Sequence, residues 1–325
     1  MQNQLYQDIG DELKLGKLSS IEVIQSLWGG YGKLVRLKFS QKSIIVKHIQ
    51  LPKPSEHPRG WNTDISHKRK LHSYQVEVNW YQEFSQVLDE RCRIPQGFKC
   101  FQKEDEWLIV MEDLASIELP YTTDNPSENH LKSSLSWLAN FHGKYMGKKC
   151  DFLWEIGTYW HLDTRPDELK VLQDIELKDS AREIDTILNN TKYQTIVHGD
   201  AKLANFCFNS NGTKCAAVDF QYVGHGCGMK DVAYFMSSAI DPEDCEEMEE
   251  WVLDIYFKEL KKALKYYKPD LSGSEIEQEW RVMFAIAWAD FQRFIKGWSP
   301  DHFKINSYTD ELTRRALDYL RLKIV

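Results

Sequence analysis

"IVHGDAKLANFCF", Ile196 to Phe208, is an apolar stretch that polar residues interrupt at short intervals. The polar residues are His198, Asp200, Lys202 and Asn205. The apolar residues on either side predict short strands, and the following "NSNGTK" predicts a hairpin turn that leads into "CAAVDFQ". We therefore expect a loop that presents Asp200 and Asn205, with Asp219 brought beside it by the neighbouring strand.

This set of side chains suits the transfer of a phosphoryl group. An Asp at the end of a strand can accept a proton from a substrate hydroxyl, and amide and carboxylate oxygens are ligands for Mg²⁺. These roles fall to Asp200, and to Asn205 with Asp219. Lys202 can neutralise charge on the moving group. Taken alone, Asp200 and Asn205 also fit a capped turn, because both residue types favour turns.

The residues before this stretch predict a small lobe rich in strands. Residues 20–49 alternate apolar and polar side chains in three runs joined by short polar loops, which predicts an antiparallel meander. A helical pattern follows at 66–90, and two further strands are predicted at 95–103 and 107–114. The polar, proline-bearing residues 50–64 predict a surface loop.

The remainder of the chain is mostly helical in pattern. Helices are predicted near 127–146, 166–190, 242–267, 274–297 and 308–324. The expected fold is therefore α+β with two lobes. Residues 1–113 form an N-terminal lobe with a five-stranded antiparallel sheet and a helix, and residues 114–325 form a larger, mainly helical lobe.

"HGDAKLAN" followed by "DFQ" resembles the catalytic and metal-binding loops of the protein-kinase-like fold, as found in aminoglycoside phosphotransferases and choline kinases. The longer "VDFQYVGHGCGMKDVAYFM" is most similar to the ecdysteroid kinase-like group. The resemblance implies ATP and Mg²⁺ as cofactors, Asp200 as the catalytic base, and Asn205 and Asp219 as metal ligands. It also implies that His198 orients the catalytic loop and that Asp231, on the next helix, braces it.

The resemblance extends into the first lobe, so that its elements run in order from Trp28 to Phe235. It implies that Lys47 contacts the nucleotide phosphates and that Glu77 pairs with this lysine. "LIVMEDL" resembles the hinge, which implies that backbone groups of three residues meet the adenine: Met111, Glu112 and Asp113. The loop "WGGYGK" implies phosphate contacts from three glycines: Gly29, Gly30 and Gly32. Taken alone, these glycines also fit a simple hairpin turn.

Three departures argue against a protein kinase. The glycine loop lacks the GxGxxG spacing, and "DFQ" stands where protein kinases carry DFG. The short path from Asp219 to Asp231 also leaves no room for an evident activation segment. The prediction is therefore a kinase of small-molecule hydroxyls, and the alternative is a nucleotide-binding pseudokinase or interaction scaffold with the same fold.

The acceptor stays open at this stage: an amino alcohol, an aminoglycoside, a steroid-like alcohol or a sugar. In the resembling families the late helices build the acceptor site, and "AIAWADFQRFIKGW" sets several side chains at helical spacing. They are Trp288, Asp290, Phe291 and Phe294. Aromatic faces and a carboxylate attract a cation, whereas Arg293 and Lys296 indicate a site that is not purely anionic. Helix packing is the alternative for these aromatic residues.

Composition narrows the partners and the compartment. The 325-residue chain has a net charge of −8, and its basic residues are dispersed except for the short "HKRK" at His67 to Lys70, which disfavours nucleic acid as a partner. No apolar window predicts a membrane span, the N-terminus does not resemble a signal peptide, and the seven cysteines show no paired spacing. We expect a cytoplasmic protein whose partner is a small-molecule alcohol; the sequence does not specify an oligomeric state.

Overall fold

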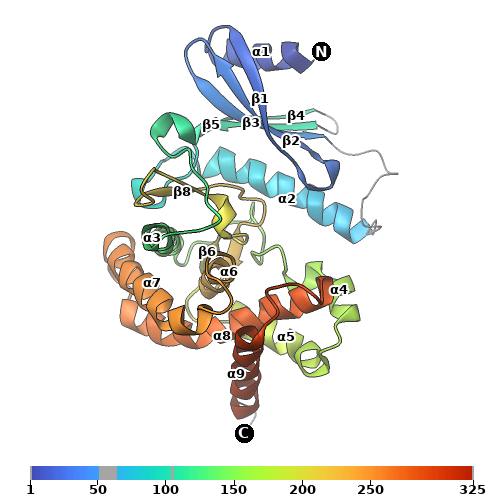
Figure 1. The fold of residues 1–325 in the computed structure, drawn as a ribbon, viewed down its shortest axis with the longest axis vertical. Helices are drawn as coiled ribbons and strands as arrows, with labels where there is room; N and C mark the ends of the chain where they lie inside the picture. The colour runs from blue at the N-terminus through green and yellow to red at the C-terminus, as the bar shows by residue number, and fades with distance from the viewer. Residues whose placement is uncertain (1, 51–63, 104–105, 324–325) are drawn as a thin grey trace.

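The computed structural model describes residues 2–50, 64–103 and 106–323. The chain forms two lobes, with the sheet at one end and most of the helices at the other (Figure 1). The predicted two-lobed α+β fold is therefore confirmed. Most of the loop predicted at 50–64 lies outside the described residues.

The small lobe is built on one antiparallel sheet of five strands in the order β1-β2-β3-β5-β4. The strands are β1 (Leu18–Ser26), β2 (Gly32–Phe39), β3 (Ser43–Gln50), β4 (Gly97–Lys103) and β5 (Glu106–Glu112). Because β3 is the central strand, its residues are shielded by neighbours on both edges. Lys47 on β3 pairs in register with Leu34 of β2 and Ile109 of β5.

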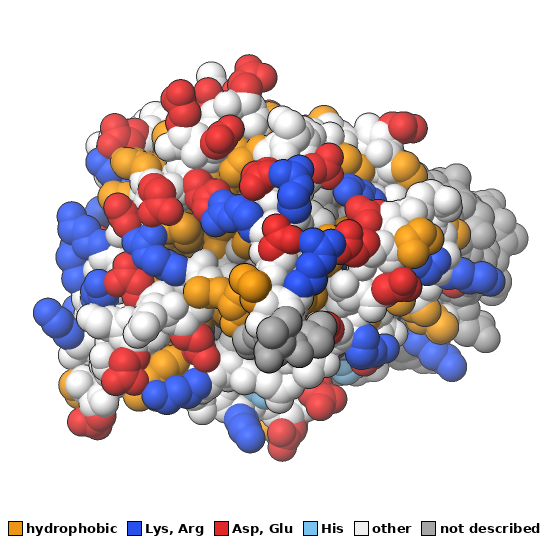
Figure 2. Space-filling view, turned by 90° about the horizontal axis from the view of Figure 1, so that it is seen from below, with side chains coloured by type: hydrophobic (Ala, Val, Ile, Leu, Met, Phe, Trp, Pro, Cys, Tyr) orange, Lys and Arg blue, Asp and Glu red, His pale blue; other side chains and the backbone are white. Residues whose placement is uncertain are grey.

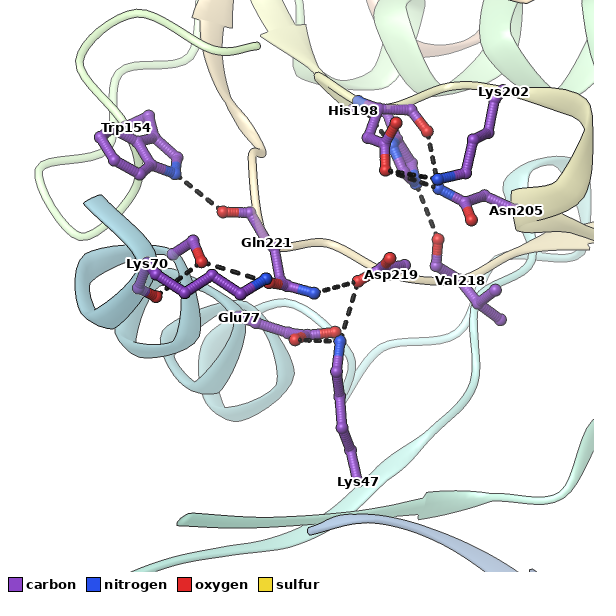
Figure 3. Close-up of polar contacts among 12 residues, drawn as sticks. Lys47, Lys70, Glu77, Trp154, His198, Lys202, Asn205, Val218, Asp219 and Gln221 are labelled. Atoms are coloured by element: carbon purple, nitrogen blue, oxygen red, sulfur yellow. Dashed lines mark hydrogen bonds and ion pairs between the residues drawn. The ribbon is translucent and has the colours of Figure 1, made fainter. Parts of the chain in front are cut away.

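Each face of the sheet is covered by one helix, so alternate residues of β3 enter different cores. Ile44 and Val46 pack with residues of α1 (Gln2–Glu12), whereas Ile45 and Ile49 pack on the side of α2 (Asp64–Glu83). Lys47 shares the parity of Ile45, and its side chain therefore points toward α2 (Figure 3).

Two details of the small lobe differ from the prediction. Helix α1 was not predicted, although Tyr6 and Ile9 are buried against the sheet at helical spacing. Helix α2 ends at Glu83 rather than near residue 90. Ser85 follows it, and its Oγ accepts a hydrogen bond of 2.9 Å from Gly97 N, which ties the end of the helix to β4.

The large lobe surrounds two short strand pairs with helices. The helices are α3 (Glu128–Tyr145), α4 (Pro166–Val171), α5 (Ile175–Asn189), α6 (Met229–Ala239), α7 (Cys245–Tyr267), α8 (Gly273–Trp298) and α9 (Ser307–Lys323). The strand pairs are β6 (Thr195–Val197) with β9 (Gly224–Gly226), and β7 (Phe206–Phe208) with β8 (Cys215–Ala217). They hold the loops that carry the polar residues singled out above.

The face of the large lobe opposite the sheet carries acidic and basic side chains interspersed with one another (Figure 2). Ion pairs join helices of the large lobe, such as Arg281 with Glu250 and Arg321 with Glu176. Exposed pairs of this kind contribute little to stability individually. None of the helices in the described ranges has the length and apolarity that a bilayer crossing requires.

Candidate active site

Lys47 joins the two lobes through two carboxylates. Its Nζ lies 2.6 Å from Glu77 Oε2 on α2 and 2.8 Å from Asp219 Oδ1, two residues beyond β8 (Figure 3). Lys47 and Glu77 are buried, whereas the Asp219 side chain is 31% exposed. The lysine, its helix partner and a predicted metal ligand are thus brought together from three separate parts of the chain.

Lys47, Glu77 and Asp219 shift one another's pKa values. Burial lowers the pKa of Lys47, but Asp219 and Glu77 outweigh burial and raise it overall, so the ammonium stays charged. Burial raises the pKa of Asp219, but the charges of Lys47 and Lys202 outweigh it and lower the pKa overall. Burial raises the pKa of Glu77 to about 7, although Lys47 opposes the shift.

The loop after β6 is shaped by one glycine and one histidine. Gly199 has a φ of 78°, and a Cβ there would lie 2.1 Å from Tyr222 O, so no other residue fits without a shift. The ring of His198 is fully buried, with Nε2 3.0 Å from Val218 O, and its Nδ1 accepts a 3.3 Å bond from Asp200 N. These partners place the ring proton on Nε2. His198 therefore orients the loop from beneath.

Asp231 on α6 holds the start of the same loop. Its Oδ2 accepts a bond of 2.5 Å from His198 N, and its Oδ1 accepts one of 2.9 Å from Gly199 N. The ring of His142 on α3 contacts Oδ2 through Nε2 at 3.1 Å. A fully buried carboxylate that accepts two backbone N–H groups fixes the backbone just before Asp200.

Asp231→Ala is expected to destabilise the fold and lower turnover together, because two buried N–H groups lose their acceptor. The cost is about 1–3 kcal/mol for each group. Urea unfolding of the variant, compared with Asp241→Ala at an exposed position two residues after the same helix, measures it. Equal stability of the two variants would contradict the bracing role.

Asp200 lies at the centre of the loop. Asn205 Nδ2 donates to Asp200 O at 2.8 Å and to Oδ2 at 3.1 Å, and Lys202 Nζ lies 3.2 Å from Oδ2. The other oxygen, Oδ1, is buried and makes no hydrogen bond of normal geometry within the described residues. Burial raises the pKa of Asp200, although Lys202 opposes the shift, which makes the carboxylate a better proton acceptor than a surface Asp.

The two predicted metal ligands lie side by side at the end of the β7–β8 hairpin. Val218 N donates to Asn205 O at 2.9 Å, so Asp219 follows directly on the residue paired with Asn205. Asn205 turns its amide nitrogen toward Asp200, which leaves the amide oxygen for another ligand. The hydrogen bonds that Asp219 accepts within the described residues go to Oδ1. The remaining oxygens are donors that Mg²⁺ accepts, so the site fits this ion.

The glycine loop lies between β1 and β2. Gly29, Gly30 and Gly32 all have positive φ, and a Cβ on Gly32 would lie 2.1 Å from His48 O. Tyr31, between them, is buried, and its hydroxyl lies 3.1 Å from His67 Nδ1 on α2. The loop is thereby fastened to the helix that carries Glu77.

Two of the three predicted hinge residues have polar side chains, and both side chains are engaged elsewhere. Glu112 pairs with Arg93 at 2.5 Å, and Asp113 accepts a 2.8 Å bond from Arg36 Nε. The backbone of Met111 lies within the sheet, opposite Ile45 and Gly97. A contribution of Glu112 or Asp113 to nucleotide binding would therefore come from the backbone.

An aromatic cluster lies beside the catalytic loop, since Tyr159 N donates to Gly199 O at 3.1 Å. The cluster contains Tyr159, Trp160, Tyr234, Phe291 and Phe294. Burial, Tyr159 and the charge of Asp200 raise the pKa of Tyr234, which places this phenol near the carboxylate. Two of the four residues singled out on α8, Phe291 and Phe294, thus face this side of Asp200.

The other two have structural partners. Trp288 is buried and packs against Phe284 and Tyr308 in the main core. Asp290 is neutralised by Arg293 at 2.8 Å and also accepts from Trp160 Nε1 at 3.0 Å. The remaining basic residue of this stretch, Lys296, pairs with Asp174 at 3.0 Å.

Three side chains at the site were not predicted to act there. Gln221 contacts Asp219, and Lys70 contacts Gln221. Lys304, after α8, has its Nζ 4.7 Å from the centre of the Tyr234 ring and 3.1 Å from Ser237 Oγ. The "Q" of "DFQ" was a visible signal for Gln221, whereas nothing in the local pattern marks Lys304.

A family of known proteins matches part of the chain. The model of the ecdysteroid kinase-like family matches residues 157–268, which include the predicted catalytic loop, Asp219 and Asp231. The match confirms the resemblance to this group over that segment. None of the curated proteins matches the chain in sequence.

Solved structures of small-molecule kinases share the fold over nearly the whole chain. Amicoumacin kinase hAmiN, in complex with AMP-PNP, Ca²⁺ and Ami, has a TM-score of 0.54 at 15% identity, and the match covers 98% of this chain and 93% of that chain. Aminoglycoside phosphotransferase APH(4)-Ia, in a ternary complex with ADP and hygromycin B, has a TM-score of 0.51 at 11% identity, with coverage of 95% and 97%. Choline kinase LicA from Streptococcus pneumoniae has a TM-score of 0.46 at 15% identity, with coverage of 98% and 99%. At these identities the likeness to hAmiN and APH(4)-Ia establishes the fold alone.

Proposed function

We propose that this protein is an ATP- and Mg²⁺-dependent phosphotransferase that moves the γ-phosphate to a hydroxyl of a small molecule. The observation that carries the proposal is the Asp200 carboxylate: Asn205 and Lys202 hold its Oδ2. The buried Oδ1 makes no hydrogen bond of normal geometry within the described residues, and the phenol of Tyr234 lies near the carboxylate. Asp200 lies on the same loop as Asn205, beside Asp219. A buried polar atom of this kind needs a partner, and the hydroxyl of an acceptor supplies one.

The roles of the residues follow from their positions. Asp200 accepts the proton of the acceptor hydroxyl as the hydroxyl oxygen attacks the γ-phosphorus, and the bond from this phosphorus to the β–γ bridging oxygen breaks, so that ADP leaves. Lys202, held beside Asp200, offsets negative charge that develops on the transferred group. Lys47, kept charged by its two carboxylates, holds the nucleotide phosphates. Bound Mg²⁺, held by Asn205 and Asp219, would offset charge on the phosphate oxygens.

The nucleotides named in the structures of the two kinases above support ATP as the donor. The alternative, a pseudokinase or scaffold, is less well supported, because Lys47, Asp200, Asn205 and Asp219 are all present and in contact with their expected neighbours. A screen of the purified protein against alcohols, followed by ATP consumption and thermal shift, tests the proposal. Saturable binding of Mg·ATP without ATP consumption for any alcohol would favour the pseudokinase.

We further propose that the acceptor is neutral or anionic rather than a cation. The aromatic faces beside Asp200 already carry the protein's own cations: Lys304 lies 4.7 Å from the centre of the Tyr234 ring, and Arg165 lies 4.8 Å from that of Phe294. The carboxylate of Asp290 is neutralised by Arg293. A steroid-like alcohol or a sugar meets these charges more favourably than an amino alcohol or an aminoglycoside.

Lys304→Met is expected to raise kcat/KM for cationic alcohols by about tenfold relative to neutral ones, because like charges brought together cost at least 1.4 kcal/mol. Kinetics on matched alcohols with and without an amino group measure the ratio. An unchanged ratio would contradict the role of Lys304.

The wild-type preference should also weaken as pH rises through about 8. Burial lowers the pKa of Lys304 to about 8. The charge of Lys202 also lowers this pKa, whereas Asp200 and Cys245 raise it. The ammonium that repels cations is present below this pH and is lost above it.

A further inference from the structure

Gln221, the third residue of "DFQ", lies between α2 and the predicted metal ligand (Figure 3). Its Nε2 donates to Asp219 Oδ1 at 2.7 Å. Its Oε1 accepts from Lys70 Nζ at 2.9 Å and from Ser73 Oγ at 3.2 Å, both on α2. Its backbone oxygen accepts from Trp154 Nε1 at 2.8 Å, and the residue is 7% exposed. Every polar atom of this side chain is therefore engaged.

The contact decides which oxygen of Asp219 is available. Oδ1 accepts from both Lys47 Nζ at 2.8 Å and Gln221 Nε2 at 2.7 Å. A carboxylate oxygen has about two acceptor positions, so these bonds fill Oδ1 and leave Oδ2 for another partner. Two donors on one oxygen also prevent the carboxylate from rotating freely.

Lys70 decides which way the amide of Gln221 faces. An ammonium has only donors, so the amide oxygen must point toward Lys70 and the amide nitrogen toward Asp219. The reverse orientation would set the amide oxygen against the carboxylate. Lys70, Ser73 and Glu77 lie on one side of α2 at spacings of three and four. Helix α2 is thus linked to Asp219 by two sets of contacts. One runs through Glu77 and Lys47, and the other runs through Lys70 and Gln221.

We propose that Gln221 is a positioning residue that presents Asp219 Oδ2 to the metal and ties this carboxylate to α2 through Lys70 and Ser73. The inference rests on the proposed function in one respect, the assignment of Asp219 as a metal ligand. Gln221 itself touches neither substrate nor metal. Its removal should therefore weaken the metal dependence of nucleotide binding and leave metal-free binding unchanged.

The test measures binding of a non-hydrolysable ATP analogue to the full chain by calorimetry over a series of Mg²⁺ concentrations, and with EDTA in place of the metal. Gln221→Met keeps the length of the side chain and removes its hydrogen bonds. We expect it to raise the Mg²⁺ concentration for half-maximal binding by about tenfold or more, the usual effect of losing a residue that supports a metal ligand. Binding in EDTA should match that of the wild type.

Two further variants keep the test decisive. Lys70 is partly buried, and Lys70→Met should shift the Mg²⁺ dependence in the same direction, because it frees the amide of Gln221 to turn. Gln194→Met, a matched control, removes a partly buried glutamine that donates to Leu188 O at 2.9 Å, and should leave every binding curve unchanged.

Three outcomes would overturn the inference. If Asp219→Asn abolishes the Mg²⁺ effect while Gln221→Met and Lys70→Met bind as the wild type does, only the role of Gln221 fails. If Gln221→Met weakens binding equally with and without metal, its role is general packing. If Mg²⁺ has no effect on wild-type binding, the assignment of Asp219 fails as well.

Discussion

Asp200→Asn is expected to lower turnover by about 10²–10⁴-fold, the usual contribution of a general base, while nucleotide binding stays nearly intact. The carboxylate accepts bonds at Oδ2 from Asn205 and Lys202. An amide at position 200 can present its oxygen there and keep both bonds. The change is then confined to the Oδ1 position, where a proton acceptor becomes a donor.

The variant should fold as well as the wild type or slightly better. Burial raises the pKa of Asp200, which means that the charged form is disfavoured in the folded protein, and the amide removes that charge. Thermal unfolding, nucleotide titration and steady-state kinetics on one preparation separate these effects. Turnover at the wild-type rate would exclude Asp200 as the base.

Lys47→Met is the second change with a large expected effect. It removes the group that neutralises Glu77 and Asp219, and a broken buried ion pair costs about 3–5 kcal/mol. It also removes the predicted phosphate contact, so affinity for Mg·ATP should fall in the same variant. The unfolding free energy and the nucleotide affinity are measured separately.

A double variant separates stability from binding. Lys47→Met with Glu77→Gln leaves one buried charge fewer, and we expect it to recover part of the stability but none of the nucleotide affinity. Recovery of affinity along with stability would contradict a direct role of Lys47 in binding.

The destabilisation by Lys47→Met should be smaller at low pH. Burial raises the pKa of Glu77 to about 7 even with Lys47 present, well above its usual value. Between the unfolded and the folded pKa the folded state binds more protons, so its stability falls as pH rises. Urea unfolding at about pH 5 and about pH 8 checks the sign, and a larger loss at the lower pH would contradict it.

Local sequence patterns were sufficient to predict much of the fold. The five strands follow from alternation and turn residues, and the β7–β8 hairpin follows from "NSNGTK" between two apolar runs. Helix α1 was missed because its short polar segment shows only a sparse apolar face, with Tyr6 and Ile9 as its buried apolar residues. Tyr6 and Ile9 become a buried apolar face only because they pack against the sheet.

The residues of the candidate site also differ in whether a local sequence pattern predicts them. Asp200 and Asn205 are close in sequence, so one motif predicts both. Gln221 acquires its position from Lys70, which is 151 residues away in the chain, and no local pattern encodes that contact. Lys70 was visible only as part of the basic "HKRK", which by itself suggests a solvent-exposed charge cluster. Contacts of this kind depend on how the lobes meet.

Transfer of the γ-phosphate of ATP to an alcohol by means of Asp200, as proposed, can be followed with ATP labelled in the γ-phosphate. The labelled ATP is incubated with a panel of neutral, anionic and cationic alcohols, and the label is measured in the products of wild type and Asp200→Asn. We predict a labelled phosphate ester of at least one alcohol with the wild type, and about 10²–10⁴-fold slower labelling with the variant. Saturable Mg·ATP binding without any labelled ester, or equal labelling by both proteins, would contradict the proposal.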